Sequence, residues 1–160
     1  MVKSLKNLQT VLKPYLEKAM EATRDEVFEI LSNKIVEYYE EPVFDNDPAD
    51  EPKYYSRTGQ ILSELTAFPL SHTGNSFGFE VGWPDSYYSY QYPGTPSFGN
   101  RNNRATGYEV LSFMNSGSHG GTVNGEHNYF DEALEEIDSK YGGVTGLFKI
   151  KCKEVGIPIR

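Results

Sequence analysis

The side chains best suited to hold a metal ion are those of His119 and His127, with Glu126 and Asp131 close by in the sequence. A zinc site needs three or four converging nitrogen, sulfur or oxygen ligands, usually supplied by short ligand pairs. Seven residues of a glycine-rich stretch separate the two histidines, and this spacing matches no short metal-binding motif. We therefore expect ordinary loop and helix-cap histidines, no bound metal and no other cofactor. A small metal-dependent hydrolase using His119 and His127 stays as an alternative.

Three carboxylates are the candidates for acid–base catalysis. Glu132, Glu135 and Glu136 could supply the pair of acids that glycosidases hold in a cleft. Their helical spacing, however, places them opposite Phe130 and Ile137, which predicts a solvated helix face. We expect no catalytic residue and no reaction.

The chain length and the single cysteine indicate one folded domain without a disulfide. The 160 residues correspond to about one domain, which we take to be residues 1–160. Cys152 is the single cysteine, so no intramolecular disulfide can form, as in proteins made in a reducing cytoplasm. A nucleophilic thiol would need a histidine partner and a lowered pKa, which the local sequence does not require. We expect Cys152 to be a small buried residue.

Charge and tyrosine content point to protein partners. The net charge of −8 opposes gripping a polyphosphate such as DNA. The 12 tyrosines favour interfaces, because each has an apolar body and a polar tip. No stretch approaches the roughly 18 consecutive apolar residues of a membrane span, and Lys3 and Lys6 interrupt the N-terminus where a signal peptide is apolar. We expect a soluble protein, without membrane contact, that completes its burial against partners.

The N-terminal part of the chain is helical. Apolar residues from Pro14 to Glu41 recur in steps of three, four or seven, which places them on one helix face. Pro14 suits the first turn of this helix, and a shorter helix over Val2–Leu12 is expected before it. The acidic, proline-containing segment 42–53 is expected to be a loop.

The clearest strand signal follows this loop. Phe77, Phe79, Val81 and Trp83 alternate with glycine and glutamate, which predicts a strand whose four large side chains face a core. We expect a hairpin with Leu65–Leu70, closed by the turn residues 72–75.

A long segment rich in Tyr, Pro, Gly and Asn, Pro84–Gly107, comes next and is expected to be a loop and the main partner-contacting arm. Tyr108–Asn115 fits both helix and strand spacing and is left unassigned, and Ser116–Asn124 is expected to be another loop.

Two helices are expected near the C-terminus. Asn128 can cap a helix that Gly142 ends, with Phe130, Ala133, Leu134, Ile137 and Tyr141 on one face. The last segment is assigned as helix because Gly156-Ile157-Pro158 is a typical helix end. The predicted fold is α+β: a long N-terminal helix packed on a small antiparallel sheet, with one or two C-terminal helices. Its parts are helical 1–41, acidic loop 42–53, β-rich 54–127 and helical 128–160.

One short segment resembles a known family. Lys53-Tyr54-Tyr55-Ser56-Arg57-Thr58-Gly59-Gln60-Ile61-Leu62 is similar to the Tyr, Arg-Thr-Gly and Leu stretch of the head-to-tail joining proteins of long-tailed bacteriophages, the neck or tail-completion proteins. In that family the stretch follows a long N-terminal helix and leads into a hairpin. Tyr108–Gly117 looks like the family's later block, and a C-terminal helix also fits. The chain departs from the family pattern in the arm 84–107 and in the helix after Gly142.

The resemblance implies a structural role in the virion. It implies a homo-oligomeric ring at the head–tail junction, assembled in the host cytoplasm, that contacts connector and tail proteins while DNA passes through as cargo. The residues expected to contact other subunits or partners are Tyr54, Arg57, Thr58, Gly59, Tyr87, Tyr88, Tyr90, Tyr92, Arg101 and Arg104. An equally weighted interpretation of Arg57 is that its guanidinium fixes the acidic loop. A peptide-binding module outside phages, using the Tyr-rich arm, is the remaining alternative.

Overall fold

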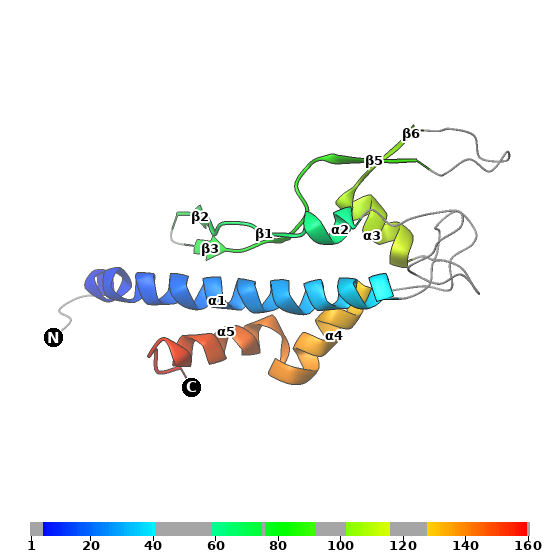
Figure 1. The fold of residues 1–160 in the computed structure, drawn as a ribbon. Coiled ribbons are helices and arrows are strands. Elements are labelled where there is room, and N and C mark those ends of the chain that lie inside the picture. Colours follow the sequence, from blue (N-terminus) through cyan, green and yellow to red (C-terminus); the bar gives the residue numbers. More distant parts are fainter. Residues whose placement is uncertain (1–4, 41–58, 75, 92–101, 116–127, 160) are drawn as a thin grey trace. The chain divides into compact units, whose positions relative to one another are not determined.

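The computed structural model in Figure 1 describes residues 5–40, 59–74, 76–91, 102–115 and 128–159. Within these residues the fold is α+β, which confirms the predicted class. The elements in chain order are α1 Leu5–Glu40, α2 Gln60–Ser63, β1 Thr66–Ala67, β2 Ser71–Thr73, β3 Ser76–Gly78, β4 Val81–Gly82, β5 Tyr87–Gln91, β6 Asn102–Thr106, α3 Gly107–Asn115, α4 Tyr129–Tyr141 and α5 Gly143–Glu154. The strands pair two by two, as β1–β4, β2–β3 and β5–β6.

The chain divides into two compact units, each made of separate stretches of sequence. The first unit contains Met1–Ile30, Ala67–Val81 and Leu134–Arg160, and the second contains Leu31–Thr66 and Gly82–Ala133. α1, α4 and the β1–β4 pair contribute residues to both units. The interpretation of residues 1–160 as one domain stays a prediction.

α1 is one continuous helix, and the expectation of two helices separated at Pro14 was wrong. The helix runs from Leu5 to Glu40 with Pro14 inside it. A proline lacks the N–H that would bond to the carbonyl four residues earlier, but this removes one hydrogen bond from a helix of 36 residues. Leu12 and Leu16 are half-buried one turn apart on either side of Pro14, so the same apolar face continues through the proline.

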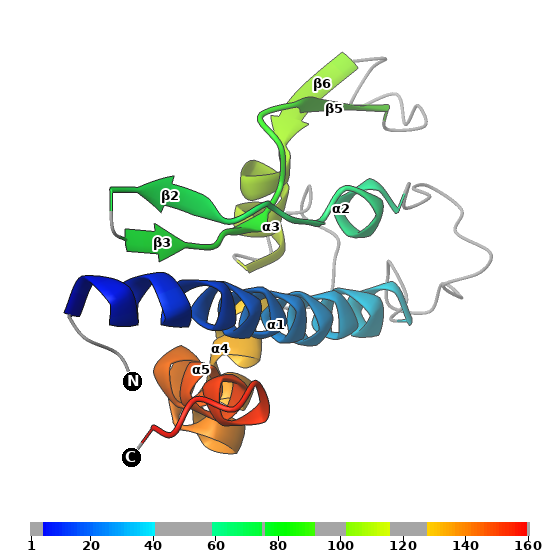
Figure 2. The same cartoon turned by 90° about the vertical axis from the view of Figure 1, so that its left-hand side faces the viewer.

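A hairpin is present as predicted, but its bounds differ. His72 and Thr73, expected in the turn, belong to β2, and of the expected first strand Leu65–Leu70 only Thr66–Ala67 is a strand, β1, which pairs with β4. β2 and β3 are antiparallel with Ser71 opposite Gly78 and Thr73 opposite Ser76, as the antiparallel arrows in Figure 2 show. Gly74 begins the turn with a φ of 61°, a conformation that glycine adopts without strain. The returning strand is shorter than expected, because pairing stops after Gly78 and resumes only in β4. The Phe68 amide still donates to the Glu80 carbonyl at 3.0 Å between the two pairs.

The four large side chains of the predicted strand do not share one buried face. Trp83 is buried, whereas Phe77, Phe79 and Val81 are only half-buried. The strict alternation of a strand holds only while the strand continues. Because the strand is interrupted between β3 and β4, the period-two pattern predicts where the strands lie but not which of their side chains are buried.

The segment 84–107 contains a hairpin, so the expectation of a long loop was wrong. β5 and β6 are antiparallel, from Tyr87 opposite Thr106 to Gln91 opposite Asn102. Its strand residues are polar and tyrosine-rich, so the apolar alternation that reveals a half-buried strand is missing. The segment next to it, Tyr108–Asn115, is helical as part of α3.

The two C-terminal helices are confirmed. Gly142 follows α4 with a φ of 73°, and its amide donates to the Asp138 carbonyl at 2.8 Å. α5 ends in a Schellman motif: the Ile157 amide donates to the Cys152 carbonyl at 2.8 Å and the Gly156 amide to the Lys153 carbonyl at 3.0 Å. Gly156 has the positive φ, 87°, that this motif needs.

The apolar face of α4 differs from the predicted one. Ala133 and Ile137 are buried as expected, but Tyr129 is buried with them, while Phe130 and Leu134 are exposed. The apolar residues of α4 cover more of the helix circumference than its buried face does, because the consecutive residues Tyr129 and Phe130 lie about 100° apart around the helix. α4 therefore carries two large apolar side chains at its surface.

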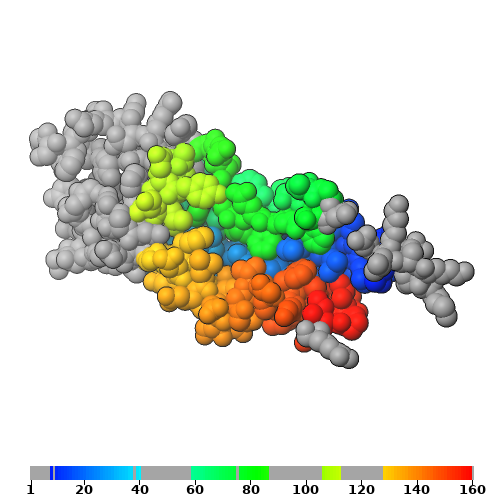
Figure 3. Space-filling view, turned by 180° about the vertical axis from the view of Figure 1, so that it is seen from behind, coloured from blue at the N-terminus to red at the C-terminus, as the bar shows by residue number. Residues whose placement is uncertain are grey.

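Each unit has its own core. The buried residues of the first unit are Ala19, Thr23, Ile30, Ile137, Leu147 and Cys152, and those of the second are Leu31, Ile35, Ile61, Leu65, Trp83, Leu111, Tyr129 and Ala133. Figure 3 shows α5, coloured orange to red, lying against the blue N-terminal part of α1 in the first unit. None of the helices in the described ranges combines the length and apolar character that a membrane crossing requires.

Candidate functional site

The predicted contact residues fall into two groups. Tyr54, Arg57, Thr58, Tyr92 and Arg101 lie outside the described residues. The described ones lie in the second unit: Gly59 at the start of α2, and Tyr87, Tyr88, Tyr90 and Arg104 in the β5–β6 hairpin. The structure thus brings four of the ten predicted residues into one hairpin.

Gly59 is the residue of the Arg-Thr-Gly segment that the structure describes, and it lies at the start of α2. It precedes α2 with a φ of 73°, in the left-handed region. Its carbonyl accepts hydrogen bonds from the Leu62 amide at 3.2 Å and the Ser63 amide at 3.0 Å. A Cβ at this position would meet nothing within 4 Å, so the backbone conformation, and not crowding, is what favours glycine.

A buried tryptophan supports α2. The Trp83 Nε1 donates to the Ile61 carbonyl at 2.6 Å. The Tyr108 ring meets the indole edge to face, with centroids 5.5 Å apart. Gly107 packs so closely on Trp83 that an added Cβ would overlap the indole Cγ and lie 2.8 Å from Cδ1. Trp83 therefore joins α2 to the start of α3.

A capping box fixes the end of the β5–β6 hairpin to α3. The Thr106 amide donates to Glu109 Oε2 at 2.7 Å, and the Glu109 amide donates to Thr106 Oγ1 at 3.2 Å. These reciprocal bonds satisfy two backbone donors at the helix start. Since Thr106 is also the last residue of β6, the strand passes directly into the helix. The hairpin is thus held at its base by the same element that packs on Trp83.

The register of the β5–β6 hairpin sets its candidate contact residues opposite small or polar ones. Tyr88 lies opposite Ala105, Tyr90 opposite Asn103 and Ser89 opposite Arg104. The described part of the chain contributes no third strand to this sheet, so each strand has an edge that is not paired within it. Such edges are able to accept a strand of a partner.

The first unit contains a polar cluster that sequence reasoning missed. Tyr141 Oη donates to Glu26 Oε1 at 2.6 Å, and Lys151 Nζ donates to Glu26 Oε2 at 3.2 Å. The hydrogen bond from Tyr141 is the main reason that the Glu26 pKa is lowered, with Lys151 adding to it against the effect of burial. Burial alone would lower the pKa of Lys151, but Glu26 and Glu154 raise it. The cluster is an ion pair with both carboxylate oxygens occupied, which suits it to join α1 to α4 and α5.

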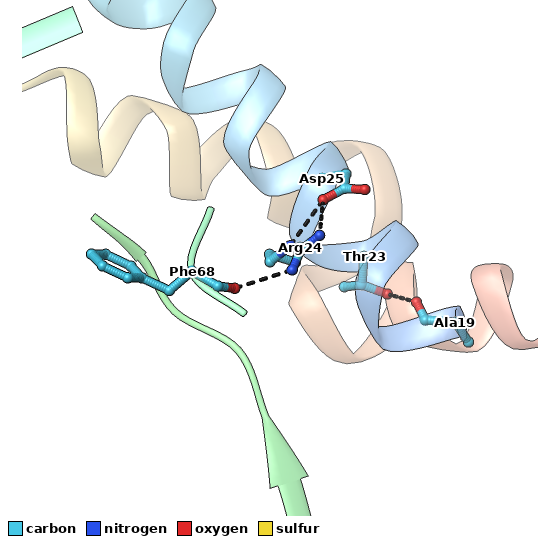
Figure 4. Close-up of polar contacts among 5 residues, drawn as sticks. All are labelled: Ala19, Thr23, Arg24, Asp25 and Phe68. Carbon is cyan, nitrogen blue, oxygen red and sulfur yellow. Dashed lines mark hydrogen bonds and ion pairs between the residues drawn. The ribbon is translucent and has the colours of Figure 1, made fainter. Parts of the chain in front are cut away.

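Arg24 joins the hairpin region to α1 in the same unit. Figure 4 shows its guanidinium between two acceptors: Nη1 donates to the Phe68 carbonyl at 3.1 Å, and Nη2 and Nε donate to Asp25 Oδ1 at 2.7 and 2.9 Å. Beside it, the buried Thr23 hydroxyl donates to the Ala19 carbonyl at 2.8 Å. Asp25 thus holds the guanidinium in place for Phe68.

The residues considered for catalysis and metal binding are described only in part. His119, Glu126 and His127 lie outside the described residues. Within residues 5–40, 59–74, 76–91, 102–115 and 128–159, no three His, Cys, Asp or Glu side chains are grouped so that they could hold a metal ion. Glu132 and Glu135 are exposed, as expected for a solvated face, and Glu136 is half-buried.

Cys152 is buried, as predicted, and burial raises the pKa of its thiol. A raised pKa lowers the fraction of the nucleophilic thiolate.

Comparisons of the chain with models of protein families, with characterised proteins and with solved structures found no match.

The Glu26 cluster leads to a prediction about acid stability. Because the Glu26 pKa is lowered from about 4.5 in the folded protein, its contribution is present above that pH and is lost as the pH falls through the folded value. Glu26→Gln is expected to lower the free energy of unfolding by about 1–2 kcal/mol at pH 7, and by less below pH 4. Urea unfolding between pH 3 and 7, followed by circular dichroism, measures this.

Glu29→Gln is the matched control, since Glu29 is exposed on the same helix. It is expected to change stability by less than about 0.5 kcal/mol at every pH. A pH-independent loss in Glu26→Gln would contradict the electrostatic role of the carboxylate.

Proposed function

We propose that this chain is a structural subunit of the head–tail junction of a long-tailed phage. It forms a homo-oligomeric ring that joins the connector below the capsid to the tail and lets the genome pass. In this proposal it catalyses no reaction, is assembled in the host cytoplasm and ends in the virion. Its partners are copies of itself and the adjoining connector and tail proteins.

The observation that carries the proposal is the place of Gly59 in the fold. The Arg57-Thr58-Gly59 segment resembles a stretch of the joining proteins that lies between a long N-terminal helix and a hairpin. Here α1 precedes Gly59, the β2–β3 hairpin follows it, and Gly59 has the positive φ that favours glycine. The order of elements and the backbone at the third residue of the triplet both support the resemblance.

The β5–β6 hairpin supports a role in assembly. A two-stranded hairpin by itself is marginally stable in water and gains stability when it pairs or packs with a neighbour. This one has five residue pairs, carries Tyr87, Tyr88 and Tyr90, and is joined firmly to α3 at its base. In the proposed ring an adjacent subunit or partner protein contacts these tyrosines and Arg104.

The net charge supports passage of DNA without binding. Each subunit carries −8, and a ring repeats this charge around its axis. Carboxylates at the lumen would repel phosphate, which lets DNA move without adhering.

Electron microscopy tests the proposal at two levels. The purified full-length protein, imaged at increasing concentration, is expected to form closed rings of uniform diameter. Antibodies against the chain, applied to virions, are expected to label the head–tail junction. Virions that contain no copy of the chain at this junction would overturn the proposal, even if the purified protein forms rings.

A further inference from the structure

The N-terminal part of α1 presents an apolar stripe to solvent. Leu8, Val11 and Tyr15 follow one another at steps of three and four residues and are 39%, 54% and 48% exposed. Residues at these steps lie on the same face of a helix. The exposed Lys18 lies three residues further along that face. We call Leu8, Val11, Tyr15 and Lys18 the α1 stripe; it is apolar with a positive end.

α4 presents a second apolar stripe, with acidic residues beside it. Phe130 and Leu134 are one turn apart on this continuous helix and are 37% and 43% exposed. Asp131 and Asp138, both exposed, lie three residues before and four residues after Leu134 and therefore next to it on the helix surface. We call Phe130, Asp131, Leu134 and Asp138 the α4 stripe. Asp131 also accepts a hydrogen bond from Asn128. Asp138 is therefore the residue of the α4 stripe better suited to pair with a cationic side chain of another molecule.

We propose that the α1 stripe of one copy of this chain docks on the α4 stripe of the next copy. Large exposed apolar side chains grouped on one helix face mark interaction surfaces. Packing the two stripes against each other would remove their apolar side chains from water. The charges select the pairing: Lys18 opposite Asp138 is favourable, whereas pairing two α1 stripes places lysines together and pairing two α4 stripes places four aspartates together.

The pairing of two different stripes gives the contact a direction. A contact between unlike surfaces is heterologous, so repetition produces a ring if the rotation closes, whereas a contact between like surfaces stops at a dimer. The inference deepens the proposed function and rests on it for its biological setting, because a ring of identical subunits needs such a contact. The contact itself is a property of the chain alone and is tested on the purified protein.

Charge reversal tests the pairing. Lys18→Glu and Asp138→Lys are each expected to raise the protein concentration at half-assembly about tenfold, measured by sedimentation velocity. The double variant Lys18→Glu/Asp138→Lys restores the opposite charges and is expected to assemble within roughly threefold of the original chain. Lys13→Glu is the matched control, because Lys13 is exposed on another face of α1 and pairs with Glu17 at 3.8 Å; it should leave assembly unchanged.

Cross-linking tests the direction of the contact. Chains carrying Val11→Cys are mixed with chains carrying Leu134→Cys and treated with a short bis-maleimide. Because the native Cys152 is buried, only the introduced thiols are expected to react with the cross-linker. The expected product is a dimer containing one chain of each kind, with no dimer of two Val11→Cys chains.

Several results would overturn the inference. They are a chain that stays monomeric at all concentrations, a double variant that assembles no better than the single ones, and cross-links between like chains. Rings that form regardless of the charges at 18 and 138 would remove this contact and leave the proposed function standing. A head-to-tail contact in a protein that virions lack would keep the contact and remove the function.

Discussion

Trp83→Ala is expected to lower the free energy of unfolding by about 3–5 kcal/mol. The indole is buried in the second unit, where its Nε1 donates to the Ile61 carbonyl at 2.6 Å and its ring meets Tyr108 edge to face at 5.5 Å. Alanine would leave a cavity against Gly107 and deprive the Ile61 carbonyl of its donor. Urea unfolding monitored by far-ultraviolet circular dichroism measures the loss, since the variant contains no tryptophan for fluorescence.

Two further variants separate the causes of this loss. Trp83→Phe keeps most of the apolar volume and removes the hydrogen bond, so it is expected to cost about 1–3 kcal/mol. Val36→Ala, at an exposed site of the same unit, is expected to cost less than about 1 kcal/mol. Equal losses for Trp83→Ala and Val36→Ala would show that the indole does not organise this core.

Local signals in the sequence predict the helices well. The periodicity of α1, the glycine after α4 and the Gly156-Ile157-Pro158 end of α5 each depend on residues a few positions apart. Pro14 is the exception, because the rule that proline ends a helix ignores how much helix continues on both sides. The apolar face through Leu12 and Leu16 decides in favour of continuity.

The hairpin of β5 and β6 could not be predicted from the alternation of apolar residues. Period-two alternation of apolar residues finds strands with a buried face, and these strands are polar apart from their tyrosines. The sequence Thr106-Gly107-Tyr108-Glu109 contains a capping box, which marks a helix start and would have assigned α3. With that boundary known, a strand ending at Thr106 becomes the natural interpretation.

The candidate functional residues likewise include local features and contacts between residues far apart in the sequence. The positive φ of Gly59 is a local feature, because it depends on the conformational freedom of one glycine. The contacts of Glu26 with Tyr141 and Lys151 join residues 115 and 125 positions apart, and those of Arg24 with Phe68 span 44. Any of many acidic and basic residues could have made such pairs, so only the tertiary structure identifies them.

The corner between α4 and α5 shows another limit of local rules. Gly142 and Gly143 have φ values of 73° and 81°, as a tight connection between helices needs, and the first of them was predicted as a helix end. Gly146 has no such backbone requirement. Its role is close packing: an added Cβ would overlap the Tyr141 carbonyl oxygen and lie 2.9 Å from its carbonyl carbon.

Gly146→Ala is therefore expected to destabilise the protein by about 2–3 kcal/mol. Helix propensity alone predicts the opposite sign, because alanine within a helix is favoured over glycine by about 1 kcal/mol. The contact is with backbone of a neighbouring helix end, which cannot rotate away as a side chain could, so the overlap outweighs the propensity. Thr145→Ala, at the adjacent exposed position, is the control and should change stability by less than about 0.5 kcal/mol. A Gly146→Ala protein that resists urea as well as the original chain would show that α4 and α5 can separate at this corner without cost.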